Sequence, residues 1–299
     1  MSEILSVMKW PLIACLLLPG ILVYLGLHIV RREIIFVDLA LAQVATLGIC
    51  VAILMHYEPN SAPAYAMSLG FTLIGAVIFT MTRNYSHHHV PQEALIGIVY
   101  VVAAAAGILL LSRSAEGNEE LRRTLIGDVL LVDPVRVWKT FGLFVGVAAI
   151  HIIFRRQFLA LSFEPERAEK EGLAVRWWDF VFYALFGVVV TSFVQIGGVL
   201  LVFSYLIVPA VCANFLAQRL GMLLAIGWIT ATLSSIVGLY CSYEFDVPTG
   251  AAIVCVLGLA MVLAATVARV RKREDVTEKH LVSPQPLPRS QSNVKPRAE

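Results

Sequence analysis

The chain has 299 residues, of which 59% are hydrophobic and 15% are charged, and its mean hydropathy is +0.80. A water-soluble domain of this length does not normally reach such values, so the composition indicates an integral membrane protein. The net charge is only +2 and the basic residues are dispersed over short loops, which argues against a nucleic-acid partner.

Nine apolar runs are long enough to cross about 30 Å of hydrocarbon as α-helices. Lipid offers no water to unpaired backbone groups, and the runs do not alternate as barrel strands do, so helices are expected. The predicted fold is therefore all-α, a polytopic bundle of eight or nine spans within a membrane domain of residues 1–268. The runs lie near residues 11–30, 36–56, 64–82, 92–112, 138–154, 179–196, 197–217, 221–242 and 248–268.

The distribution of Lys and Arg predicts the orientation of the bundle. With the loop 155–178 and the C-terminus in the cytoplasm, most loop Arg and Lys residues, Arg31, Arg32 and Arg83 among them, lie inside. The outer segment 125–134 (LIGDVLLVDP) is apolar enough to re-enter the membrane partly. Residues 269–299 become polar and rich in proline, and we expect them to form a disordered cytoplasmic tail.

The charged segment 162–174 predicts a short cytoplasmic helix, with Pro165 in its first turn and Gly172 as its stop. Between membrane spans, a run of charges is usually no more than a solvated surface helix. Here it has the pattern acid-x-x-x-Ala-x-x-x-Gly, formed by Glu164, Ala168 and Gly172. That pattern resembles the coupling loop of the zinc/manganese/iron-type ABC permeases, the ABC-3 family.

Three further stretches resemble the same family in the same order, at 92–112, 198–213 and 245–264. The resemblance implies a non-catalytic permease subunit of a bacterial ABC importer, in the inner membrane, with zinc or manganese as transported ion and no permanent cofactor. It also implies three protein partners: a cytoplasmic ATPase that contacts Glu164, Ala168 and Gly172, an extracytoplasmic metal-binding protein, and a second copy of the chain. The chain has no GxxxxGK[ST] sequence, so ATP hydrolysis is expected on a separate protein.

Asp38 and Gln43 in the second span are the first candidates for the ion pathway, because acids and amides at membrane depth are costly unless they have a function. In the family this span usually reads Asp-Ala-x-Ala-His, whereas glutamine stands here at the histidine position. Five residues correspond to about 500° of helix rotation, so one regular helix does not aim both side chains at one ion. A π-bulge could join them, Asp38 could instead stabilise the helix dipole, or the pathway could take a harder or hydrated ion such as manganese.

Glu93 and Asp246 also match family acids, at the starts of the fourth and ninth spans. Each could equally be an ordinary acid at a helix N-terminus. The triplet 87–89 (His-His-His) could bind metal at the cytoplasmic side, although such triplets are more often solvated loops. His28 and His151 have no ligand partner three or four residues away and are not favoured as ligands.

Gly197 and Gly198 are expected to break the chain between the sixth and seventh spans, and Pro209 to kink the seventh. A broken helix beside a pathway is common in transporters. Two other functions stay open: a secondary transporter driven by an ion gradient, and an ABC permease for a metal chelate. No inverted repeat or intramembrane charge pair is evident in the sequence to favour the gradient-driven transporter.

Overall fold

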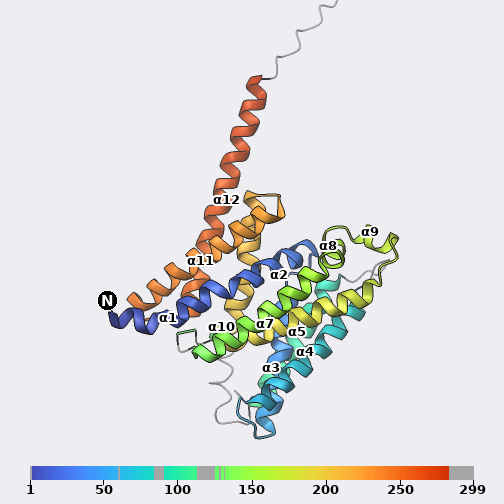
Figure 1. Cartoon of the computed structure of the whole chain (residues 1–299), viewed down its shortest axis with the longest axis vertical. Helices are drawn as coiled ribbons and strands as arrows, with labels where there is room; N and C mark the ends of the chain where they lie inside the picture. The colour runs from blue at the N-terminus through green and yellow to red at the C-terminus, as the bar shows by residue number, and fades with distance from the viewer. Residues whose placement is uncertain are drawn as a thin grey trace, which may run out of the picture.

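A computed structural model describes residues 2–59, 61–83, 91–112, 125–127, 129–130 and 132–282, and these residues contain helices and no strand (Figure 1). The all-α prediction is therefore confirmed. The helices are α1 (Ser2–Leu17), α2 (Pro19–Arg31), α3 (Val37–Leu54), α4 (Ala62–Thr82), α5 (Gln92–Leu111), α7 (Pro134–Ile153), α8 (Arg155–Phe163), α9 (Pro165–Lys170), α10 (Val175–Leu216), α11 (Leu220–Phe245) and α12 (Thr249–Val282).

Eight helices within the described residues are long and apolar enough to cross a membrane. The sequence predicted nine such runs, and the difference lies in α10, which contains both the sixth and the seventh. The helix α10 is not straight, because Gly198 has φ 72° and ψ 167°. Phe193 and Tyr205 have ring centroids 6.0 Å apart, whereas in a straight helix they would lie about 18 Å apart along the axis. The chain therefore folds back at Gly198, and the two halves of α10 form a hairpin.

The hairpin requires glycine because another backbone packs against it. A β-carbon on Gly198 would lie 2.4 Å from the backbone nitrogen of Gly127, in the short segment 125–127. Gly250, at the start of α12, also lies against this segment, with its Cβ position 2.6 Å from the carbonyl oxygen of Ile126. Part of the segment predicted to re-enter the membrane thus covers the turn of α10, whereas Asp128 lies outside the described residues. The helix continues through Pro209 with helical backbone angles.

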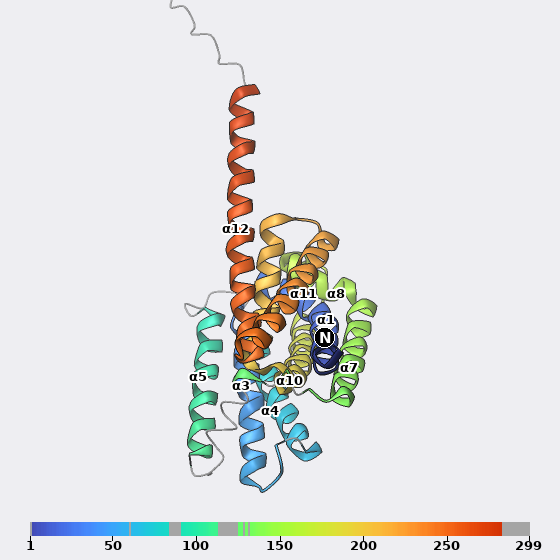
Figure 2. The ribbon, with the colours of Figure 1, turned by 90° about the vertical axis from the view of Figure 1, so that its left-hand side faces the viewer.

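The long helix α10 forms the centre of the bundle, where it packs against α2, α3, α4, α11 and α12. Several of its aromatic side chains, including Tyr183, Phe186 and Tyr205, are fully buried. In contrast, α5 lies at one side of the bundle and α12 extends beyond it (Figure 2), and most residues of these two spans are not buried. This distribution suits a bundle that is surrounded by lipid or by other subunits.

The loops lie at the two ends of the bundle, as expected for helices that cross a membrane in alternating directions. Side chains from the turn after α2, the end of α4, the end of α8 and the start of α10 meet at one end. At the other end, residues near the starts of α4 and α7 and before the turn of α10 line a cavity of about 400 Å³. The predicted inner and outer segments are thus separated in space.

The helix α12 continues to Val282 and projects from the bundle (Figure 1), so the region predicted as a disordered tail from residue 269 begins as helix. Residues 269–282 contain neither glycine nor proline and are rich in Arg, Lys and Glu, which are good helix formers. Residues 283–299 and the histidine triplet at 87–89 lie outside the described residues.

Candidate ion site and coupling segment

Asp38 lies in the first turn of α3 and is 1% exposed. Its neighbours along the helix, Val37, Ala40 and Leu41, belong to the hydrophobic core. The backbone N–H groups of Asp38 itself and of Leu39 lie nearby, but within the described part of the chain neither carboxylate oxygen has a hydrogen-bond partner. A buried carboxylate without a partner costs several kcal/mol, roughly, unless it is protonated or binds a cation. Asp38 is therefore the acid that best fits a place on an ion pathway.

Gln43 lies on the same helix and is 8% exposed. The helix α3 is α-helical without interruption from Val37 to Leu54, so no π-bulge turns Gln43 toward Asp38. The two side chains therefore leave the helix about 140° apart. Of the alternatives left open by the sequence, the π-bulge is excluded.

Glu93 has a structural partner. Its Oε1 accepts a hydrogen bond from the backbone N–H of Ile35 at 3.0 Å. This bond connects the start of α5 to the short turn that precedes α3. Glu93 thus lies near the chain just before Asp38 and supports the start of that helix.

Asp246 is exposed and ends α11 in the left-handed conformation, with φ 50°. It lies near Gly250, which packs at the end of the bundle where α10 turns. The start of α3 follows the turn at Arg32, which is bonded to the opposite end of the first half of α10. The structure therefore does not bring Asp246 together with Asp38.

The predicted coupling segment, residues 162–174, contains the last two residues of one helix and the whole of a second. The helix α8 (Arg155–Phe163) follows α7 directly, and Glu164 then separates it from α9 (Pro165–Lys170). The sequence analysis placed residues 155–161 within a loop, whereas they form α8, and the contacts of α8 with α2 and α10 stabilise this short helix.

The helix α9 matches the predicted short helix closely. Pro165 occupies its first position, and Gly172 ends it with φ +72°. The Gly172 N–H donates to the Glu169 carbonyl and the Leu173 N–H to the Ala168 carbonyl, which is the Schellman pattern. Arg167 pairs with Glu164 at 2.9 Å and with Glu171 at 2.8 Å on the exposed face, while Ala168 is fully buried. The segment is thus a short helix whose charged side chains face outward, while the small side chain of Ala168 packs inward.

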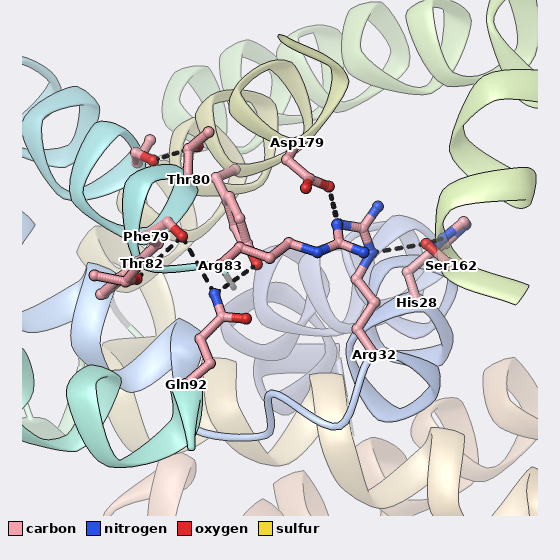
Figure 3. Close-up of polar contacts among 11 residues, drawn as sticks. His28, Arg32, Phe79, Thr80, Thr82, Arg83, Gln92, Ser162 and Asp179 are labelled. Carbon is pink, nitrogen blue, oxygen red and sulfur yellow. Dashed lines mark hydrogen bonds and ion pairs between the residues drawn. The ribbon is translucent and has the colours of Figure 1, made fainter. Parts of the chain in front are cut away.

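A buried charge cluster lies beside this segment, and sequence reasoning missed it (Figure 3). Asp179, in the first turns of α10, is 1% exposed and pairs with Arg32 at 2.9 Å and also with Arg83. Burial lowers the pKa of Arg32, and the Asp179 carboxylate acts in the opposite direction. Arg32 and Arg83 entered the sequence analysis only as indicators of orientation. The missed signal was Asp179 itself, an acid at the start of an apolar run that needs a cationic partner.

The comparisons with known proteins agree with this architecture. The manganese transport system membrane protein MntC of Listeria innocua is 34% identical over 212 residues, 69% of this chain and 75% of that protein. MntB of Synechocystis, named as a manganese transport system membrane protein, is 31% identical over 214 residues, 69% of each chain.

Among solved structures, a chain of PsaBC from Streptococcus pneumoniae in complex with Fab has the same fold. The TM-score is 0.74 at 21% identity, and the match covers 88% of this chain and 94% of that one. Residues 5–268 match the ABC 3 transport family. The chain therefore belongs to the ABC-3 transport family.

Proposed function

We propose that this chain is the membrane-spanning, non-catalytic permease subunit of an ABC importer for manganese ions. Its relatives are named for manganese transport. The observation that supports the proposal most directly is Asp38, a buried acid within a span that has no hydrogen-bond partner among the described residues. Carboxylate oxygens such as those of Asp38 suit manganese better than zinc. Manganese is the transported substrate and not a resident cofactor.

A cytoplasmic ATPase supplies the energy in this proposal, since the chain has no Walker A sequence. The exposed charges of α9, including Glu164, form the contact with the ATPase, while Ala168 anchors the helix and Gly172 ends it. This arrangement places α9 and the C-terminus in the cytoplasm of a bacterial cell, with residues 1–268 as the permease domain in the inner membrane.

Other partners follow from the exposed surfaces. The peripheral helices α5 and α12 leave most of their apolar surface uncovered, which suits a second copy of the chain and membrane lipid. At the outer end, the cavity of about 400 Å³ carries Asp133, Arg136 and Lys139 on its lining. Its charged rim suits an extracytoplasmic metal-binding protein that delivers the ion.

The alternatives receive less support. A gradient-driven transporter needs neither a coupling helix nor membership of an ABC family, and both are present. A permease for a metal chelate would not need a buried acid beside the pathway, since the chelator already surrounds the ion.

Gln43 lies on another face of α3 than Asp38, and we take it as a separate candidate donor on the pathway. The residue at position 43 is then expected to influence which ion is carried. Imidazole favours zinc relative to oxygen donors, so we expect Gln43→His to reduce the preference for manganese over zinc. Competition of Zn²⁺ with radioactive Mn²⁺ uptake in proteoliposomes measures that preference. An unchanged ratio of the two inhibition constants would place Gln43 away from the pathway.

The proposal is tested by co-purification with an ATPase encoded beside the permease, followed by the manganese content of the cells. Proline does not adopt the φ of +72° found at Gly172, so Gly172→Pro is expected to distort the end of α9 and to lose most of the bound ATPase and the manganese accumulation. Gly142→Ala is the matched control, because a β-carbon there meets no atom of the described residues within 4 Å. Wild-type protein that binds no ATPase yet still accumulates manganese would refute the importer and favour a gradient-driven transporter.

A further inference from the structure

Ser162 connects the coupling segment to the membrane helices. It lies at the end of α8, three residues before the first residue of α9, and is 4% exposed. Its Oγ accepts a hydrogen bond from Nε of Arg32 at 2.7 Å and lies 2.8 Å from Nδ1 of His28. Because the hydroxyl accepts from arginine, its own proton is free to be donated to the imidazole. Two bonds therefore join α8 to the end of α2.

Arg32 extends this connection to two further helices. Its Nη1 donates to Oδ1 of Asp179 at 2.9 Å, and its guanidinium carbon lies 3.9 Å from the ring centroid of Phe182, also on α10. Asp179 in turn pairs with Arg83, directly after α4. As Figure 3 shows, the guanidinium of Arg32 lies between Asp179 and Ser162. One side chain thus links α2, α8 and α10, and through Asp179 the end of α4.

The charge of the cluster separates it from the ion pathway. Two guanidinium groups surround one carboxylate, and a divalent cation would be repelled from such a site. The cluster is buried, so removal of one partner leaves an uncompensated group, and its geometry resists small displacements. These properties suit a mechanical link better than an ion-binding site.

Movement of α9 can pass through α8 as well as through the short connection from α9 to α10. The main contacts of α9 are with α8, and α8 in turn contacts α2, α10 and α7. We propose that the Ser162–Arg32–Asp179 chain is the link that transmits displacement of α9 to α2 and α10. This inference rests on the proposed function, because it takes α9 as the site where the ATPase acts. Arg32 and Ser162 are positioning residues in this arrangement and do not contact the ion.

The test is the ratio of manganese transported to ATP hydrolysed, measured in proteoliposomes with the complete complex of permease, ATPase and binding protein. Ser162→Ala removes both bonds from α8 to α2 and leaves the pair between Arg32 and Asp179 intact. We expect the complex to assemble and to hydrolyse ATP, while the ratio falls by about fivefold or more, the lower end of typical coupling between two sites. Arg32→Lys, which keeps the charge but loses the planar fork that reaches both partners, is expected to lower the ratio in the same way.

Thr80→Ala is the matched control. Thr80 lies near the end of α4, and its hydroxyl donates to the carbonyl of Ala76 in its own helix, so the ratio is expected to stay at the wild-type value. If Ser162→Ala and Arg32→Lys only lower the melting temperature while the folded complex transports at the wild-type ratio, the cluster is merely structural and the inference is wrong. If the wild-type chain binds no ATPase, that result refutes the proposed function and also the inference, which depends on it.

Discussion

Replacement of Asp38 by asparagine is expected to abolish manganese uptake without destabilising the protein. The substitution keeps the shape of the side chain and removes a buried charge that has no hydrogen-bond partner in the described structure. Loss of even an outer-shell partner of a metal typically costs about 10–100-fold in affinity or activity, so loss of a direct ligand should lower uptake by at least that much. Radioactive Mn²⁺ uptake and the melting temperature of the purified protein measure the two effects.

The combination of the two effects distinguishes a transport residue from an ordinary helix acid. A carboxylate that only stabilised the N-terminus of α3 would contribute about 0.3–1 kcal/mol. Its loss would lower stability slightly and leave uptake intact, and that result would remove Asp38 from the pathway. Asp133→Asn is the matched control for stability, because Asp133 caps α7 by accepting from the Val135 N–H at 3.2 Å. Asparagine caps a helix equally well, so the stability of this variant should not change.

Gly26→Ala is expected to produce the largest loss of folding stability among the single substitutions considered. A β-carbon at this position in α2 would lie 1.8 Å from the carbonyl oxygen of Leu206 and 2.7 Å from its carbonyl carbon, in the second half of α10. These are backbone atoms, so the clash is relieved only if α2 moves away from the central helix. Overpacking typically costs about 1–3 kcal/mol and occasionally more, and we expect a value of about 3 kcal/mol or above.

The expected result is a low yield of folded protein and a lower melting temperature. Gly20→Ala on the same helix is the control, since the nearest atoms, from Trp228, are 3.9 Å away. Alanine is favoured over glycine within a helix by roughly 0.5–1 kcal/mol, so this control should be as stable as the wild type or slightly more so. Equal stability of the two variants would contradict the close approach of α2 and α10.

Local patterns predicted the parts of the fold that depend on neighbouring residues. A membrane helix satisfies its backbone hydrogen bonds internally, so apolar length alone located the spans. Glycine at 197 and 198 marked the place where the chain reverses, because a left-handed φ at Gly198 is accessible to glycine at little cost. The pattern from Glu164 to Gly172 predicted a short helix with its start and stop close to those observed.

The partners of the buried polar groups were decided only by the tertiary structure. Asp179 is paired with Arg32, 147 positions away in the sequence, and Ser162 with His28, 134 positions away. Helical periodicity carries no information over such separations, and only the packing of α2, α8 and α10 brings these side chains together. The same holds for Asp38: the sequence determined that a carboxylate lies within an apolar span, whereas only the packing around α3 decided that it is buried without a hydrogen-bond partner in the described structure.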